Sequence, residues 1–253
     1  QNSHGCKTCP MNSRAGQPAQ TSDLVDVHAL LAAYYKLVPD VSLAEQRVVF
    51  GTSGHRGSSL DSAFNETHIA AITQAIVEYR TGVPTPAISH AILRYNASIA
   101  EGEPQADGIV VTPSHNPPRD GGFKYNPPHG GPADSDATNW IANRANEIIA
   151  EGSHAVKRAE PSGVGTYDYR GNYVNDLENI IDMAAIKKAG VHIGADPLGG
   201  ASVHYWSAIA ERYGLDLTVV GPGVDPQWGF MTLDWDGKIR MDPSSASVMA
   251  SVL

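Results

Sequence analysis

The chain has 253 residues, of which 42% are hydrophobic and 18% are charged, and its formal net charge at pH 7 is −9. A chain of this length can bury a sizeable core without a framework of disulfides. The acidic balance argues against nucleic acid as a partner, because nucleic-acid binders usually present a basic face. No apolar run approaches the ~20 residues that cross a bilayer, so no membrane is expected as a partner. The net negative charge does not exclude an anionic substrate, because a binding site for an anion needs only a few local cations.

Segment 1–20 is predicted to be an N-terminal tail, and it holds the only two cysteines, Cys6 and Cys9. A Cys-x-x-Cys pair is half of a zinc site or a redox pair, but no second pair follows it. We therefore interpret this pair as incidental, and residues 1–10 as an extension ahead of a start at Met11. The lack of cysteine elsewhere and of an apolar export signal favours a cytoplasmic location.

Helices and short strands are predicted to alternate after the tail. A first helix is expected to follow a cap at Thr21 or Ser22. The next element is a strand at Val48–Phe50, which runs into a glycine-rich turn at 51–57. Asn65 is predicted to cap a second helix, because apolar residues then recur at helical spacing as far as Tyr79.

A further strand and a further helix are predicted in the middle of the chain. The run Gly108–Val111 is typical of a strand buried in a parallel sheet, and a helix is expected over Ser135–Glu151. Beyond a linker at 160–165, the pattern predicts a short helix at Asp182–Ala189. A βαβ unit is then expected, with strands at Val191–Ala195 and Leu215–Val220 around a helix. The predicted fold class is α/β, with a mixed or parallel sheet layered with helices.

Segment 113–132 has the strongest bias in composition, because ten of its 20 residues are Gly or Pro. It leaves directly from the strand at Gly108–Val111, and ligands of open α/β sheets bind at the carboxyl ends of strands. Ser114 therefore presents a hydroxyl on a stiff support. A hydrolase nucleophile is one interpretation, but the Gly-x-Ser-x-Gly elbow is absent and His115, its neighbour in sequence, is poorly placed as a base.

A second interpretation is that Ser114 carries a phosphoryl group. A phosphoserine bears about −1.5 to −2 charges at neutral pH and therefore needs cations nearby. Lys124 lies at the other end of the same segment, and Arg56 lies in the glycine-rich turn. The acidic pair in Asp234-Trp-Asp236-Gly could belong to a metal loop. We interpret it instead as an acidic β-turn.

Three stretches resemble bacterial phosphoglucomutases of the α-D-phosphohexomutase superfamily. The resemblance is carried by the motifs Phe50-Gly-Thr-Ser-Gly-His-Arg-Gly57, Thr112-Pro-Ser-His-Asn-Pro-Pro118 and Asp120-Gly-Gly-Phe-Lys-Tyr-Asn-Pro-Pro128. The match runs from Met11 to Leu253, and the extension at 125–134 resembles the glucose-preferring branch best. The resemblance implies the first domain of that fold and the beginning of the second.

The resemblance also implies an activity, which is the interconversion of glucose 1-phosphate and glucose 6-phosphate by an isomerase. Ser114 would be the phosphoserine, Arg56 and Lys124 would lie near its phosphate with Lys124 as general base, and His115 would have a less defined role. Mg²⁺ would bind Ser114 through the phosphate, with carboxylate ligands from outside this chain. Glucose 1,6-bisphosphate would be the intermediate and activator, and a phosphorylated hexose the substrate.

The chain also departs from the family pattern. The family has four domains, whereas this chain would hold a phosphoserine domain at 21–178 and the start of a second domain at 179–253. A strand-helix-strand block of the relatives is expected to be missing near 80–82. We therefore expect a fragment, a degraded or mis-assembled product, or a subset of a longer chain, inactive by itself. The alternative is a non-catalytic remnant that binds phosphate or a partner.

Overall fold

The computed structural model describes residues 10–51, 54–79, 85–152, 154–158, 165–221 and 223–251. Cys6 and Cys9 therefore lie outside the described residues. The described chain forms two compact units. The first unit holds residues 26–114 and 119–167, and the second holds 10–25, 115–118 and 168–251. The domain limits predicted from the sequence, at 20 and 178, stay predictions.

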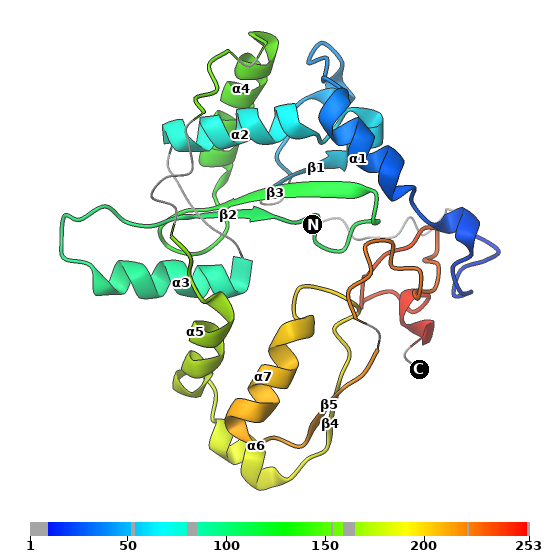
Figure 1. Ribbon diagram of the computed structural model, residues 1–253, viewed down its shortest axis with the longest axis vertical. Coiled ribbons are helices and arrows are strands. Elements are labelled where there is room, and N and C mark those ends of the chain that lie inside the picture. The colour runs from blue at the N-terminus through cyan, green and yellow to red at the C-terminus, as the bar shows by residue number, and fades with distance from the viewer. Residues whose placement is uncertain are drawn as a thin grey trace. The chain divides into compact units, whose positions relative to one another are not determined.

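The first unit is a small sheet covered by helices (Figure 1). Its strands are β1 (Gly54–Ser58), β2 (Gly108–Val111) and β3 (Asp120–Asn126), in the order β1-β3-β2 with both pairs antiparallel. Its helices are α1 (Val27–Lys36), α2 (Glu66–Tyr79), α3 (Thr85–Ser98) and α4 (Ser135–Ala150), with 3-10 turns at Ala44–Gln46 and Ser59–Asp61. Helices α2 and α4 lie on one side of the sheet and α3 on the other (Figure 1).

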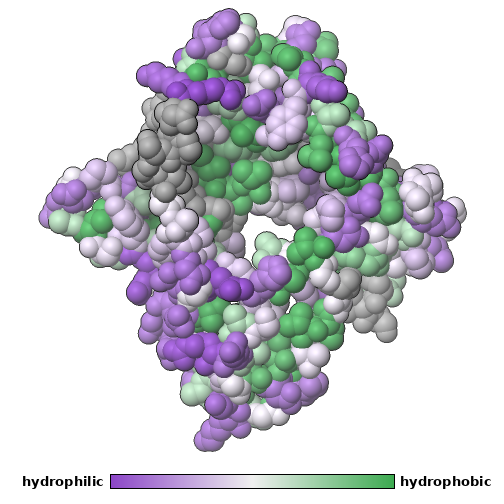
Figure 2. Space-filling model, in the orientation of Figure 1, coloured by the Kyte–Doolittle hydropathy of each residue, from purple (hydrophilic) through white to green (hydrophobic). Residues whose placement is uncertain are grey.

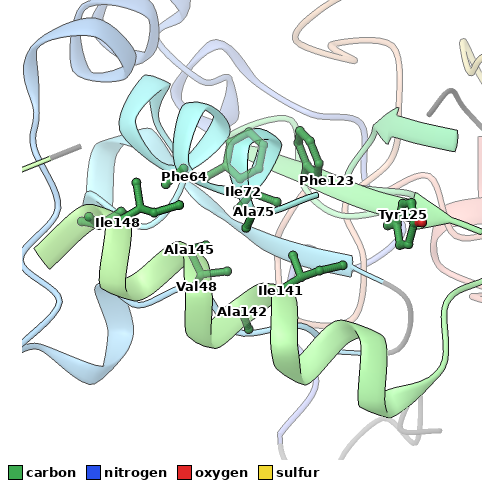
Figure 3. Close-up of a cluster of buried hydrophobic side chains, with 12 residues drawn as sticks. Val48, Phe64, Ile72, Ala75, Phe123, Tyr125, Ile141, Ala142, Ala145 and Ile148 are labelled. Atoms are coloured by element: carbon green, nitrogen blue, oxygen red, sulfur yellow. The ribbon is translucent and has the colours of Figure 1, made fainter. Parts of the chain in front are cut away.

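The core of this unit lies between the sheet and helices α2 and α4 (Figure 3). Phe123 and Tyr125 point from β3 toward Ile72 of α2 and Ile141 of α4, and each of these four side chains is at most 1% exposed. Alternate residues of a strand face opposite sides of a sheet. Lys124, between the two buried aromatic residues, therefore faces the other side.

Side-chain caps fix where the helices begin. Asp134 accepts a hydrogen bond from Ala137 N at the start of α4, and Asn65 accepts one from His68 N at the start of α2, as predicted. The predicted cap of the first helix is wrong. Asp26 caps α1 through Ala29 N, whereas residues 21–23 form a separate 3-10 turn.

The glycine-rich turn predicted at 51–57 contains strand β1, and Val48–Phe50 is not a regular strand: Phe50 makes an isolated bridge to His55. Glycine is disfavoured in strands, but here neighbouring segments of the same chain pack so closely that a side chain could not fit. A Cβ at Gly57, for example, would lie 2.6 Å from the oxygen of Ala63. Likewise, β3 lies inside the predicted loop 113–132, and β2 pairs antiparallel rather than parallel.

Helix α3 has no counterpart in the sequence-based predictions. Its sequence nevertheless contains a helix-start signal, because Pro86 is its second residue and proline favours the first turn. Ile88 and Ile92, one helical turn apart, are both buried. This apolar spacing is the second signal that could have located the helix.

The second unit contains the predicted βαβ arrangement. Helix α5 (Tyr169–Asp176) and helix α6 (Met183–Ala189) precede strand β4 (Ile193–Ala195), helix α7 (Val203–Tyr213) and strand β5 (Leu217–Val219). A 3-10 turn at Leu177–Asn179 joins α5 to α6, and another lies at Val248–Ser251. Strands β4 and β5 are parallel, with Ile193 opposite Leu217. This unit therefore confirms the α/β class.

The acidic pair Asp234 and Asp236 lies in a tight turn, as predicted. Gly237 N donates to the Asp234 carbonyl oxygen, and Asp234 N donates to the Lys238 carbonyl oxygen. Arg240 contacts both carboxylates, at 3.1 and 2.8 Å. Nζ of Lys238 also lies 3.8 Å from Oδ2 of Asp236, so two side-chain cations face the two carboxylates.

Polar and apolar residues are interspersed over the visible face of the molecule (Figure 2). Among the described residues, no helix combines the length and the apolar character that a membrane span requires.

Candidate active site

The residues predicted to carry chemistry gather on the side of the β1-β3-β2 sheet that faces away from α2 and α4. Gly54 lies opposite Lys124 in the β1–β3 register, and Arg56 lies opposite Gly122. Residues directly opposite each other, and residues two apart on one strand, share a face of the sheet. Arg56 and Lys124 therefore project from the same face, on diagonally neighbouring positions.

Gly54 gives Lys124 the space for its side chain. A Cβ added at Gly54 would lie 2.8 Å from Cγ of Lys124 and 2.6 Å from the carbonyl oxygen of Phe123. Such distances are shorter than van der Waals contact, so a larger residue would force Lys124 to move. The aliphatic part of Lys124 thus lies across the bare backbone of β1.

Gly122 does the same for the serine loop, which we define as residues 112–114. Thr112 N donates to the Gly122 carbonyl oxygen at 2.7 Å, which extends the β2–β3 ladder by one residue. A Cβ at Gly122 would lie 2.7 Å from Cα of Pro113. The loop therefore turns across this face of β3 beside Gly122, whose other neighbour is Arg56. In this way the sheet brings Ser114, Arg56 and Lys124 to one face.

The backbone of Ser114 is itself unusual. Its φ is +65°, in the left-handed region that non-glycine residues rarely occupy. Ser114 N donates to Oγ1 of Thr112 at 3.1 Å, which closes the turn. A left-handed residue costs about 1–2 kcal/mol. Such strain, on an exposed side chain, is typical of functional positions.

Arg56 and Lys124 influence each other electrostatically. The pKa of Lys124 is lowered, first because the side chain is partly buried and second because the positive charge of Arg56 is close. Nε of Arg56 is buried and has no hydrogen-bond partner among the described residues. Two cations with an unused N–H donor form a site that favours an anion, and a phosphate group would satisfy both.

His115 and Arg119, at the two ends of segment 115–119, each lie near an acidic side chain. His115 is exposed, belongs to the second unit, and lies with Nε2 4.0 Å from Oδ2 of Asp242 in that unit. Arg119 pairs with Asp61. Three of the four predicted site residues, Ser114, Arg56 and Lys124, therefore belong to the unit that holds the β1-β3-β2 sheet, whereas His115 belongs to the second unit.

Three positioning residues were missed by sequence reasoning: Gly54, Gly122 and Thr112. The sequence of a glycine-rich stretch does not indicate which glycine is required by the close approach of a neighbouring residue. The signal that could have found Thr112 is its place two residues before the serine, where a hydroxyl commonly closes a turn.

Comparisons with known proteins agree with this fold. The sequence profile described as phosphoglucomutase/phosphomannomutase, alpha/beta/alpha domain I, matches residues 80–151. The solved structure of parafusin (phosphoglucomutase) from Paramecium, in its open form, superposes with a TM-score of 0.58 at 17% identity, over 78% of this chain and 46% of that one. A phosphoglucomutase/phosphomannomutase family protein from Burkholderia thailandensis superposes with a TM-score of 0.51 at 18% identity, over 72% and 45%.

The chain is similar to phosphohexomutases over almost all of its length, and its residues 80–151 match the first domain of that family. Its sequence is 45% identical to a phosphoglucomutase of Komagataeibacter xylinus over 288 residues, which cover 94% of this chain and 52% of that relative. The chain thus spans about half the length of this relative. Since 94% of 253 residues is about 238, about 50 positions of the alignment have no counterpart here.

Proposed function

We propose that Ser114 carries the phosphoryl group of a phosphoglucomutase, which interconverts glucose 1-phosphate and glucose 6-phosphate. The observation that carries this proposal is the cation pair of Arg56 and Lys124 on the sheet face that holds the strained Ser114. Phosphoryl transfer needs positioning and charge neutralisation more than covalent chemistry from the protein. The relationship to a phosphoglucomutase at 45% identity supports the choice of glucose phosphates.

The reaction consists of two transfers that balance. In the first, the 6-hydroxyl oxygen of glucose 1-phosphate attacks the phosphorus of phosphoserine 114, the bond from phosphorus to the serine oxygen breaks, and glucose 1,6-bisphosphate forms. The hydroxyl proton passes to a base. In the second, after the sugar has turned round, the serine oxygen attacks the phosphorus of the 1-phosphate, and the bond from phosphorus to the C1 oxygen breaks. The base returns its proton to the C1 oxygen, glucose 6-phosphate is released and the phosphoserine is restored.

Lys124 is suited to receive the hydroxyl proton. A lysine can act as a base only in its neutral form, and the lowered pKa of Lys124 increases the neutral fraction at a given pH. Arg56 stays charged and donates to the phosphate oxygens. The proposed division of labour therefore assigns proton transfer to Lys124 and charge neutralisation to Arg56.

The family resemblance also implies Mg²⁺, and the described residues do not by themselves fit it. They contain no group of three histidine, cysteine or carboxylate side chains that could hold a metal ion. A phosphate on Ser114 would supply oxygen ligands of the kind that Mg²⁺ prefers, but only part of a set of six. We therefore assign no step of the reaction to the metal.

The proposal is tested by a coupled assay that detects glucose 6-phosphate formed from glucose 1-phosphate, in the protein that carries this chain. Ser114→Ala is expected to abolish turnover, and Arg56→Gln to lower kcat by about 10²-fold or more, as for other lost oxyanion donors. Arg119→Gln is the matched control, because Arg119 is paired with Asp61. Turnover that survives Ser114→Ala would refute the proposal.

A further inference from the structure

His55 lies in β1 directly before Arg56, on the core face of the sheet. Its ring stacks on Phe64 and on His68, with centroids 5.8 and 5.3 Å apart. The side chain is buried, with 3% exposed. An apolar ring could fill the same space, so packing alone does not explain a residue with two polar nitrogens.

Both ring nitrogens of His55 contact the backbone that flanks β1. Nε2 lies 2.8 Å from the carbonyl oxygen of Ala63, after the strand. Nδ1 lies 3.3 Å from the amide nitrogen and 3.2 Å from the carbonyl oxygen of Val49, before the strand. A neutral ring protonated at Nε2 donates to Ala63 and accepts from Val49 N–H. The ring thereby joins the chain that enters β1 to the chain that leaves it.

The segment held by His55 leads to a residue that lies near the Arg56 guanidinium. Two residues after Val49 comes Gly51, whose N–H donates to the Gly54 carbonyl oxygen at 2.9 Å. A Cβ at Gly51 would lie 3.9 Å from Nη1 of Arg56, which is ordinary contact distance. Gly51 therefore lies near the Arg56 guanidinium, and His55 holds Val49, two residues before Gly51.

We propose that His55 is a positioning residue, which holds the Arg56 guanidinium beside Lys124 through its contact with Val49. A role of this placement in catalysis rests on the proposed function. The position of Arg56 beside Lys124 does not depend on that function, because the charge of Arg56 acts on Lys124 whether or not a substrate exists. If His55 sets the distance between the two cations, loosening it must weaken that effect.

The effect can be measured as the pH midpoint of Lys124 titration. Competitive acetylation over a pH series, read on the Lys124 peptide by mass spectrometry, gives this midpoint, with the exposed Lys36 as internal reference. Arg56→Gln removes the neighbouring charge and is expected to raise the midpoint, because the ammonium form is no longer repelled. The difference between this variant and the wild type is the largest change in the Lys124 midpoint that losing the influence of Arg56 can cause.

Two substitutions at His55 separate its contacts. His55→Gln keeps a donor near the Nε2 position but loses the contact with Val49, and it is expected to raise the Lys124 midpoint toward that of Arg56→Gln. His55→Asn keeps a polar atom at the Nδ1 position, and it is expected to return the midpoint toward the wild-type value. Ile148→Val, in the same core, is the control for lost stability and is expected to leave the midpoint unchanged.

A folded His55→Gln protein with the wild-type midpoint would overturn the proposal, whatever its melting temperature. If His55→Gln does not fold, Val49→Pro removes the N–H that Nδ1 accepts at a position where the side chain is 60% exposed. An unchanged midpoint in that folded variant would equally overturn it. A shifted midpoint in His55→Gln, combined with no mutase turnover in the wild-type protein that carries this chain, would support His55 as positioning residue while contradicting the proposed function.

Discussion

At the scale of single residues, two glycines decide where the chemistry lies. Gly54 leaves room for Lys124, and Gly122 leaves room for the serine loop, so both groups reach the same face of the sheet. The sequence motifs indicated which side chains matter, namely Ser114, Arg56 and Lys124. They did not indicate the spacing between them, because close approach depends on residues that lack a side chain.

Gly54→Ala tests this role of a bare backbone. The added methyl would lie 2.8 Å from Cγ of Lys124 and 2.6 Å from a carbonyl oxygen, so both must shift. We expect a loss of about 1–3 kcal/mol in unfolding free energy, as for other overpacked sites. Mutase turnover should fall further than this loss of stability explains.

The measurements for Gly54→Ala are urea unfolding and the coupled assay. Gly165→Ala is a matched control, since its added Cβ would meet nothing within 4 Å. Equal stability and turnover in Gly54→Ala and the wild type would contradict the described packing of Lys124.

His68 predicts a pH dependence of stability. Burial is the main cause that lowers its pKa from 6.5 to about 4, and the neighbouring His55 also lowers it, while the hydrogen bond to the Gln46 carbonyl oxygen acts in the opposite direction. Between pH 6.5 and 4 the unfolded chain binds a proton that the folded chain does not. The contribution of His68 is therefore fully present above pH 6.5 and is lost as the pH falls toward 4, by about 1.4 kcal/mol per pH unit.

This expectation is checked by urea unfolding at several pH values between 4 and 7. His68→Gln retains a donor toward the Gln46 carbonyl oxygen but does not titrate, so its stability should fall less steeply with acid than that of the wild type. Identical slopes in the two proteins would show that His68 titrates normally in the folded chain.

At the scale of elements, capped and amphipathic helices could be predicted from the sequence, whereas the short strands could not. Helix α4 was expected because Ile141, Ala145 and Ile148 recur on one face, and it lies within one residue of the predicted range. Strand β1 was missed because its sequence, Gly-His-Arg-Gly-Ser, lacks the β-branched residues that mark strands. Its pairing with β3 depends on close packing, which local sequence does not express.

The cap of α4 gives a prediction at this scale. Asp134 accepts a hydrogen bond from Ala137 N at 2.8 Å, and α4 supplies much of the core opposite β3. Asp134→Ala should lower the unfolding free energy by about 1 kcal/mol, because the first turn loses its cap. Asp134→Asn, which retains the acceptor, should restore most of it. Thermal unfolding of both variants checks this, and equal losses would contradict a capping role.

At the scale of the whole molecule, the net charge of −9 coexists with a site that favours anions. The two observations are compatible, because Arg56 and Lys124 would act on an anion over a few ångströms. The remaining charges are spread over the surface and are screened by salt. The chain spans 52% of the Komagataeibacter phosphoglucomutase.

The most direct test of the central claim is the mass of the Ser114 peptide after incubation of the protein with glucose 1,6-bisphosphate. We predict a gain of about 80 Da, one phosphoryl group, on Ser114. The gain should be absent in Ser114→Ala and reduced in Arg56→Gln. A phosphoryl group found on another residue, or an unmodified Ser114 in protein that forms glucose 6-phosphate, would contradict Ser114 as the phosphate carrier.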